Sequence, residues 1–268
     1  MSSSSIPFFS IIVSSHNSGS FLQESIDSCL TQSFTNFEII IVDSGSIDES
    51  LDFLFDADLV NIRLLSLRSC SADHARGRNV GASLASGKYI CFLDAGDVWH
   101  PAMLKVKHEL LLTTKADLIT TDFDPIFGAI SAAWPINDHV NCLSYSRIEF
   151  WPSVYSNKFN LSATSVLTQK FLEFDESQDI SGVEGYELWL RMLSYHYSAV
   201  KISASLGSFR VTPSFSAAKK KYSQLIKTQK IFCFYQVGAS KYLWFAIFFY
   251  KQLVRIVAVC LKLVIRLR

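Results

Sequence analysis

Short apolar runs that alternate with helical segments constrain the fold of this chain more than any other feature. The runs Phe8–Val13 and Phe37–Val42 are rich in Ile, Val and Phe, which is typical of strands buried in a parallel sheet. Between them, Phe21–Gln32 carries apolar residues at helical spacing. Further strands are predicted at Ile62–Leu67, Tyr89–Leu93 and Asp117–Thr121, and further helices at Ala75–Ser86, after Pro101 and at Gly185–Tyr195. The alternation predicts an α/β fold with a doubly wound, mostly parallel sheet flanked by helices.

Two of the predicted strands end in short acidic turns that contain glycine. Asp43 is followed by Ser-Gly-Ser, and Asp94 is followed by Ala-Gly-Asp. Ligands of open α/β sheets bind outside the carboxyl ends of the strands, and glycine lets the backbone approach them closely. Carboxylates at that edge suit ribose hydroxyls or a divalent cation that bridges phosphate oxygens. A plain turn or helix-cap role for each aspartate is the structural alternative.

Three longer motifs accompany these turns. Asp43–Asp48 reads D-S-G-S-I-D, Arg78–Asp94 contains R-N-V-G and ends in Y-I-C-F-L-D, and Glu184–Arg191 reads E-G-Y-E-L-W-L-R. In this order and spacing they resemble the motifs of the family 2 glycosyltransferases over roughly residues 7–215. The resemblance implies the GT-A fold and the transfer of a sugar from a nucleotide diphosphate-sugar to an acceptor hydroxyl, with inversion at the anomeric carbon.

The resemblance also implies a role for each matching residue. The residues expected to bind the nucleotide are Ser14, His16, Asp43, Ser44, Arg78, Asp94 and Ala95. Asp94 and Asp97 would hold a divalent cation, Mn²⁺ or Mg²⁺, and Glu184 is the side chain nearest to the family's catalytic base. A UDP-sugar is the first expectation for the donor.

Three departures from the family motifs each remove an acid. Ser44 replaces the second aspartate of the nucleoside turn, Gly96 replaces an acid that usually ligates the metal, and Gly185 replaces the usual base. Glu184 is one residue away from that base, which is about 100° of rotation on a helix. The alternative hypothesis is therefore a catalytically degenerate protein of the same fold that only binds nucleotide-sugars.

The sequence predicts three regions. Residues 6–124 form the donor nucleotide half of the transferase domain, residues 125–215 form its acceptor half, and residues 216–268 form a basic tail. Between Pro125 and about Phe159 the hydrophobic periodicity fades, which predicts loops near an acceptor cleft. Six widely spaced cysteines without a C-x-x-C pair favour buried thiols over disulfides or a zinc site.

The tail differs sharply in charge from the rest of the chain. From Ala217 to Arg268 there are 11 Lys and Arg residues and no Asp or Glu, whereas residues 1–216 carry a net charge of about −10. Basic residues at 251, 255, 262 and 266 share one side of an otherwise apolar helix. This pattern predicts an amphipathic helix on an anionic membrane surface. Packing against the domain or a partner and a true membrane span stay open, and nucleic-acid binding is disfavoured because the other face is so apolar.

The N-terminus sets the expected compartment. Met1–Ser5 is polar and lacks the basic and apolar regions of a signal peptide. Together with the tail, this predicts a cytoplasmic protein that is peripheral on the inner face of the cell membrane. The expected acceptor is a glycan or a lipid-linked sugar, in the synthesis of a cell-surface polysaccharide or glycolipid.

Overall fold

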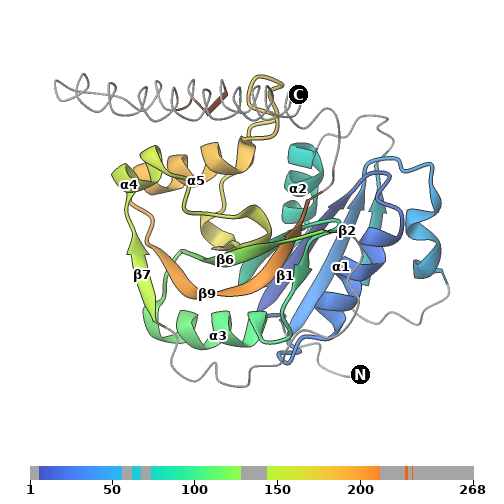
Figure 1. Ribbon diagram of the computed structural model, residues 1–268, viewed down its shortest axis with the longest axis horizontal. Helices are drawn as coiled ribbons and strands as arrows, with labels where there is room; N and C mark the ends of the chain where they lie inside the picture. Colours follow the sequence, from blue (N-terminus) through green and yellow to red (C-terminus); the bar gives the residue numbers. More distant parts are fainter. Residues whose placement is uncertain are drawn as a thin grey trace, which may run out of the picture.

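A computed structural model describes residues 6–55, 62–67, 74–127 and 144–211, together with residues 227, 228 and 231. In these ranges the strands form one nine-stranded mixed sheet, and helices cover both of its faces (Figure 1). The predicted α/β class is therefore confirmed. The basic tail lies outside the described residues except at 227, 228 and 231.

The first four strands, all within the predicted donor half, form a parallel part of the sheet. Its strands lie in the order β3 (Ile62–Ser66), β2 (Phe37–Asp43), β1 (Phe9–Ser15) and β4 (Tyr89–Asp94). The elements between them are α1 (Ser20–Leu30), the 3-10 helix η1 (Glu49–Leu54) and α2 (His74–Ser83). Each strand pairs with its neighbour in parallel, as the alternation of strands and helices predicts.

The second half of the sheet is mixed rather than mostly parallel. Its strands are β5 (Val98–Trp99), β6 (Leu118–Ile126), β7 (Tyr145–Ile148), β8 (Ser165–Leu167) and β9 (Ala199–Arg210). Only β6 and β9 pair in parallel there, whereas β8, β5 and β7 each join a neighbour in the antiparallel sense. Antiparallel strands need no helical crossover between them. These three strands of two to four residues can therefore be connected to the sheet by loops.

The helices of the second half lie on both sides of the sheet. They are α3 (Met103–Thr114), α4 (Phe150–Tyr155), the 3-10 turns η3 (Leu161–Ala163) and η4 (Thr168–Lys170), and α5 (Glu184–Ser194). Helices α1 and α3 pack on one face, while α2 and α5 pack on the other (Figure 1).

The prediction of loops between Pro125 and Phe159 is wrong for part of that segment. Strand β6 continues to Ile126, and β7 and α4 follow within the described residues. Pro152 lies in the first turn of α4, where a helix leaves its backbone N–H groups unpaired in any case. Pro125 and Pro152 therefore do not break these elements, although they interrupt the hydrophobic periodicity that would have predicted them.

Strands β1, β2 and β4 bury both of their faces over most of their length. Phe9, Ile11 and Val13 of β1 face α1 and α3, whereas Ile12 faces α2. Helix α2 lies very close to β1, because a Cβ at Gly81 would come within 2.4 Å of Ile12 Cγ2. The glycine of the R-N-V-G motif is thus required by packing.

The register of β1 arranges the strand ends that matter for function. Ser14 lies opposite Asp94 on β4, and Ser15 lies opposite Asp43 on β2. Both acidic turns consequently emerge at the same edge of the sheet, on either side of β1. Among the residues described, no helix is both long and apolar enough to cross a bilayer.

Candidate active site

A cavity of about 810 Å³ opens at the carboxyl ends of β1 and β4. Its other walls come from α4, the segment that follows it, and the N-terminal turn of α5. Six of the predicted site residues line this cavity: Ser14, Arg78, Ala95, Asp94, Asp97 and Glu184. Residues from the predicted donor and acceptor halves therefore meet in one place.

Arg78 is the central charge of this cavity. Its guanidinium is almost fully buried, and it donates from Nη2 to Asp94 Oδ1 at 2.6 Å and from Nη1 to Glu184 Oε1 at 2.9 Å. Burial alone would lower the pKa of Arg78, but the charges of Asp94 and Glu184 outweigh burial and raise it. Arg78 thus remains a cation, and it ties the end of β4 to the start of α5.

Two buried polar atoms at this cavity lack a hydrogen-bond partner within the described part of the chain. They are Ser14 Oγ and Arg78 Nε, and both residues line the cavity. Buried polar atoms in folded proteins are nearly always paired, so such exceptions mark places where a ligand or water belongs. The pair is well suited to a ligand that accepts hydrogen bonds, such as a phosphate or a ribose.

The Asp94–Asp97 turn has a shape that explains why glycine stands in it. Asp97 N donates to Asp94 O at 3.0 Å, and Gly96 has a φ of 105°. A positive φ at the third residue is typical of a type II turn and favours glycine. An acid at position 96 would strain this backbone. The geometry of the turn therefore explains why a glycine stands here in place of an acid.

Asp97 is held from two sides. Ser162 Oγ donates to its Oδ2 at 2.6 Å, and Arg210 N donates to its Oδ1 at 3.0 Å. Burial, and then the charge of Asp94, raise the pKa of Asp97 to about 7, in spite of these hydrogen bonds. The two carboxylates therefore repel each other in the absence of added positive charge.

The described residues do not form a metal cage by themselves. They contain no group of three or more His, Cys, Asp or Glu side chains placed to hold an ion. Asp94 is paired with Arg78, and both oxygens of Asp97 accept hydrogen bonds. Mg²⁺ is commonly held by one or two carboxylates plus the phosphates of a substrate. Asp94 and Asp97 fit that arrangement, in which a donor diphosphate completes the ligand set.

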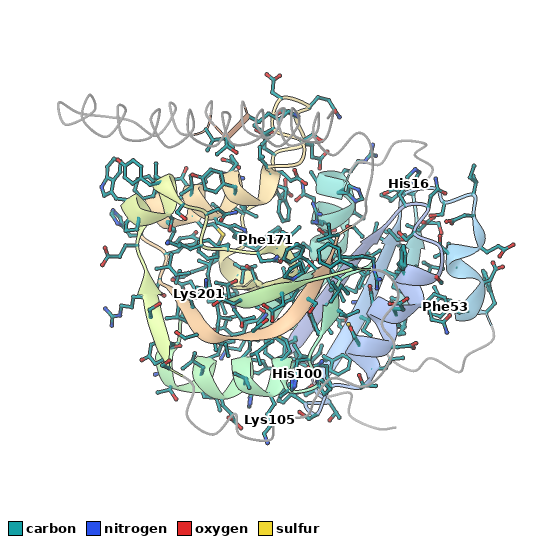
Figure 2. The ribbon with its side chains drawn as sticks, viewed as in Figure 1. His16, Phe53, His100, Lys105, Phe171 and Lys201 are labelled. Carbon is teal, nitrogen blue, oxygen red and sulfur yellow. The ribbon has the colours of Figure 1, made fainter. Side chains whose placement is uncertain are left out.

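The turn Asp43–Asp48, which is predicted to bind the nucleoside, lies outside the cavity lining. Asp43 Oδ2 accepts from Gly45 N at 3.1 Å and Ser46 N at 3.0 Å, while its Oδ1 accepts from Ser46 Oγ at 2.5 Å. His16 Nδ1 lies 3.1 Å from Ser44 O, and Figure 2 shows His16 at the carboxyl ends of the donor-half strands. In this structure Asp43 organises its own turn, and the nucleotide-binding roles of Asp43, His16 and Ser44 stay predictions.

Glu184 begins α5 and faces the cavity. Its Oε1 accepts from Arg78, and its Oε2 accepts from the backbone N–H of Gly182. The neighbouring Gly185 also lines the cavity, and a Cβ there would meet Leu161 Cδ1 at 3.4 Å and Trp189 Nε1 at 3.6 Å. Those are ordinary van der Waals contacts, so a Cβ fits at position 185.

Arg210 is a cavity residue whose role the sequence pattern does not define. Its Nε donates to Gly96 O at 3.0 Å, and its guanidinium lies 4.2 Å from the centre of the Phe21 ring. It also forms an ion pair with Glu24 at 2.5 Å. Arg210 thus braces the Asp94–Asp97 turn. The stretch Arg210-Val-Thr resembles the R-V-H pattern of the family, but no local pattern predicts the contact of Arg210 or of Ser162 with this turn, because both reach it through tertiary contacts.

The fold and cavity together define an α/β protein with a charged, polar cavity at the carboxyl edge of its sheet. The sequence model described as glycosyl transferase family 2 matches residues 10–171. The chain therefore belongs to glycosyltransferase family 2, as its motifs predict.

Relatives differ in how much of their length the chain covers. A β-1,3-glucosyltransferase of Escherichia coli, WfaP, is 26% identical over 229 residues, which is 83% of this chain and 84% of WfaP. Its name describes transfer from UDP-Glc to α-D-GlcNAc-diphosphoundecaprenol. The uncharacterized E. coli glycosyltransferase YibD is 31% identical over 127 residues, and the match spans 47% of this chain but only 36% of YibD.

Solved structures confirm the fold. Staphylococcus aureus TarS in complex with UDP-GlcNAc matches with a TM-score of 0.61 and 16% identity, over 82% of this chain and 66% of TarS. The mannosyltransferase PcManGT of Pyrobaculum calidifontis, in complex with GDP-Man and Mn²⁺, matches with a TM-score of 0.66 and 12% identity, over 88% of this chain and 67% of PcManGT. The GT-A fold predicted for the chain is thus shown.

Proposed function

We propose that this chain is an inverting glycosyltransferase that moves a sugar from a nucleotide diphosphate-sugar to an acceptor hydroxyl. The observation that carries the proposal is the cavity in which Arg78 lies between Asp94 and Glu184. A buried cation suits a leaving diphosphate, and a carboxylate across from it suits the removal of an acceptor proton.

The donor is proposed to bind at the β1–β4 side of the cavity. Ser14 Oγ and Arg78 Nε would supply hydrogen bonds to its ribose and phosphates, which would satisfy both unpartnered atoms. The complexes of TarS with UDP-GlcNAc and of PcManGT with GDP-Man support a nucleotide-sugar as the donor. UDP is our first choice of nucleotide. Because Ser44 stands in place of an acid of the family motif, a comparison of UDP-sugars with GDP-sugars tests the choice of nucleobase.

In the proposed reaction, Glu184 takes the proton from the acceptor hydroxyl as the oxygen attacks the anomeric carbon. The bond from that carbon to the diphosphate oxygen breaks on the opposite face, so the configuration inverts. Arg78 balances the negative charge that develops on the leaving diphosphate. Its hydrogen bond to Glu184 helps to direct that carboxylate into the cavity.

A divalent cation, Mn²⁺ or Mg²⁺, would be held by Asp94 and Asp97 together with the donor diphosphate, and it would supply further positive charge to the leaving group. The Mn²⁺ present with PcManGT supports this part of the proposal. Ser162 and Arg210 would keep the Asp97 carboxylate in place beside Asp94.

The proposed acceptor is a glycan or a lipid-linked sugar in the synthesis of a cell-surface polysaccharide or glycolipid. WfaP supports a lipid-linked acceptor through its name, because the match covers most of both chains. The basic tail would hold the protein on the inner face of the cell membrane, in the cytoplasm, through anionic lipids. No nucleic acid is proposed as a partner.

The second candidate function is nucleotide-sugar binding without catalysis. Gly185 and Gly96 stand where the family has acids, and both oxygens of Glu184 already accept hydrogen bonds. A carboxylate held at both oxygens has less freedom to turn toward an acceptor hydroxyl. These observations favour a binder if Glu184 cannot release its partners.

The release of nucleotide diphosphate from UDP-Glc, UDP-GlcNAc and GDP-Man, with Mn²⁺ or Mg²⁺ present, separates the two functions. For a transferase we expect release by the full chain, at least a hundredfold less with Glu184→Gln, and little change with Gly185→Asp. Asp94→Ala should abolish release by weakening donor binding. A nucleotide that raises the Tm of the wild-type chain without turnover, together with release by Gly185→Asp alone, would instead support the binder.

A further inference from the structure

The turn that precedes α5 sets the orientation of Glu184. Gly182 has a φ of 84°, and Val183 N donates to Ile180 O at 2.9 Å. This turn directs the N–H of Gly182 to the Oε2 of Glu184, while Arg78 holds the Oε1. The carboxylate is thus fixed by one side chain from α2 and by the backbone of its own turn.

Lys227 binds this turn from a distant part of the chain. Its Nζ donates to Gln178 O at 2.9 Å and to Ser181 O at 2.8 Å. A lysine ammonium carries three N–H donors, so one side chain can bridge two carbonyl groups. Both carbonyls lie within four residues of Gly182, and the bridge joins the two ends of the turn.

Two neighbours of Lys227 also contact the site. Ile231 is buried in an apolar cluster with Val154, Tyr186 and Ile180, and Ile180 belongs to the turn itself. Thr228 lines the cavity. Residues 227, 228 and 231 thus contact both the wall of the cavity and the turn that precedes Glu184.

We infer that Lys227 is a positioning residue, which holds the 178–182 turn so that Glu184 presents its carboxylate to the acceptor. This inference rests on the proposed function, in which Glu184 is the base. Without the ammonium, the turn loses its bridge and the N–H of Gly182 no longer meets Oε2 reliably. We expect donor binding at Ser14 and Asp94 to change little, because these residues belong to β1 and β4 and not to the turn before α5.

The test compares Lys227→Met with Lys227→Arg in the full chain. For Lys227→Met we expect kcat to fall about tenfold, which is the scale of one or two hydrogen bonds to a charged group, with the donor KM unchanged. Lys227→Arg keeps a cationic donor and should restore most of the turnover. Lys170→Met is the matched control, because Lys170 pairs with Asp117 at 2.9 Å and is not part of the cavity lining.

A second readout does not depend on turnover. Amide hydrogen exchange at Gly182 should become faster in Lys227→Met and stay slow in Lys227→Arg, since only the first variant removes the bridge. Wild-type kcat in Lys227→Met, equal impairment in both variants, or unchanged exchange at Gly182 would each overturn the inference.

The two proposals fail in different ways. If Glu184→Gln keeps wild-type turnover, the proposed base is wrong, and the exchange at Gly182 still decides whether Lys227 orders the turn. If Glu184→Gln is impaired but Lys227→Met is not, the base stands and only the role of Lys227 is refuted.

Discussion

Lys107 provides the sharpest test of the energetics of this fold. It lies on α3 and is completely buried, with its Nζ 2.9 Å from Ser165 Oγ and 5.6 Å from the centre of the Trp99 ring. Cys91 Sγ is 3.0 Å from the same Ser165 hydroxyl. Burial lowers the pKa of Lys107 from 10.5 to about 8, and the nearby Cys91 offsets this only in part. We predict that Lys107→Met stabilises the protein at neutral pH.

The magnitude follows from the two pKa values. A fall from 10.5 to about 8 corresponds to about 3 kcal/mol in favour of the neutral amine in the folded state. Because the folded pKa is depressed, this stability is fully present only above pH 10.5 and is lost as the pH falls through about 8. At pH 7 the wild-type protein therefore carries the whole penalty. Methionine has a similar length and no charge, and after the loss of the contacts to Ser165 and Trp99 we expect a net gain of about 2 kcal/mol.

Urea unfolding of both proteins at pH 7 and pH 9.5 measures this difference. The advantage of Lys107→Met in the free energy of unfolding should shrink by about 2 kcal/mol between these values, since every other titrating group is shared. Lys105→Met is the control, because Lys105 is exposed on the same helix and Figure 2 shows it on the outer side of α3. A difference that stays constant with pH, or a variant that is less stable at pH 7, would refute the reasoning.

The remaining predictions concern packing and the central charge. Gly81→Ala should destabilise the fold by about 1–3 kcal/mol in thermal unfolding, because its Cβ would overlap a buried strand side chain. Gly77→Ala is its control and should be neutral or slightly stabilising, since the nearest atom would be 3.6 Å away and alanine favours helices. Arg78→Met should lower the affinity for UDP at least tenfold by calorimetry and reduce stability, because it leaves Asp94 and Glu184 without their buried partner. Unchanged UDP affinity in Arg78→Met would argue against the donor site.

The sequence determined the parallel strands β1, β2, β3 and β4 almost completely. Apolar runs with β-branched residues specify strands β1, β2 and β4. The acidic turns after β2 and β4 emerge at one edge of the sheet because parallel strands share a direction. The D-S-G-S-I-D and R-N-V-G motifs also lie within residues 10–171, the part of the chain that matches the family. These features depend on residues close in the sequence, so local periodicity and turn chemistry reveal them.

Only the tertiary structure decided which side chains meet. Arg78 and Glu184 are brought together from α2 and α5, and Arg210 reaches the Asp94–Asp97 turn from the last described strand. Asp43 looks equivalent to Asp94 in the sequence, yet its carboxylate is taken by its own turn. Such pairings depend on how distant elements pack against each other, which no local pattern encodes. For the same reason the mixed second half of the sheet, and the bridge from Lys227 to the turn before Glu184, became visible only in three dimensions.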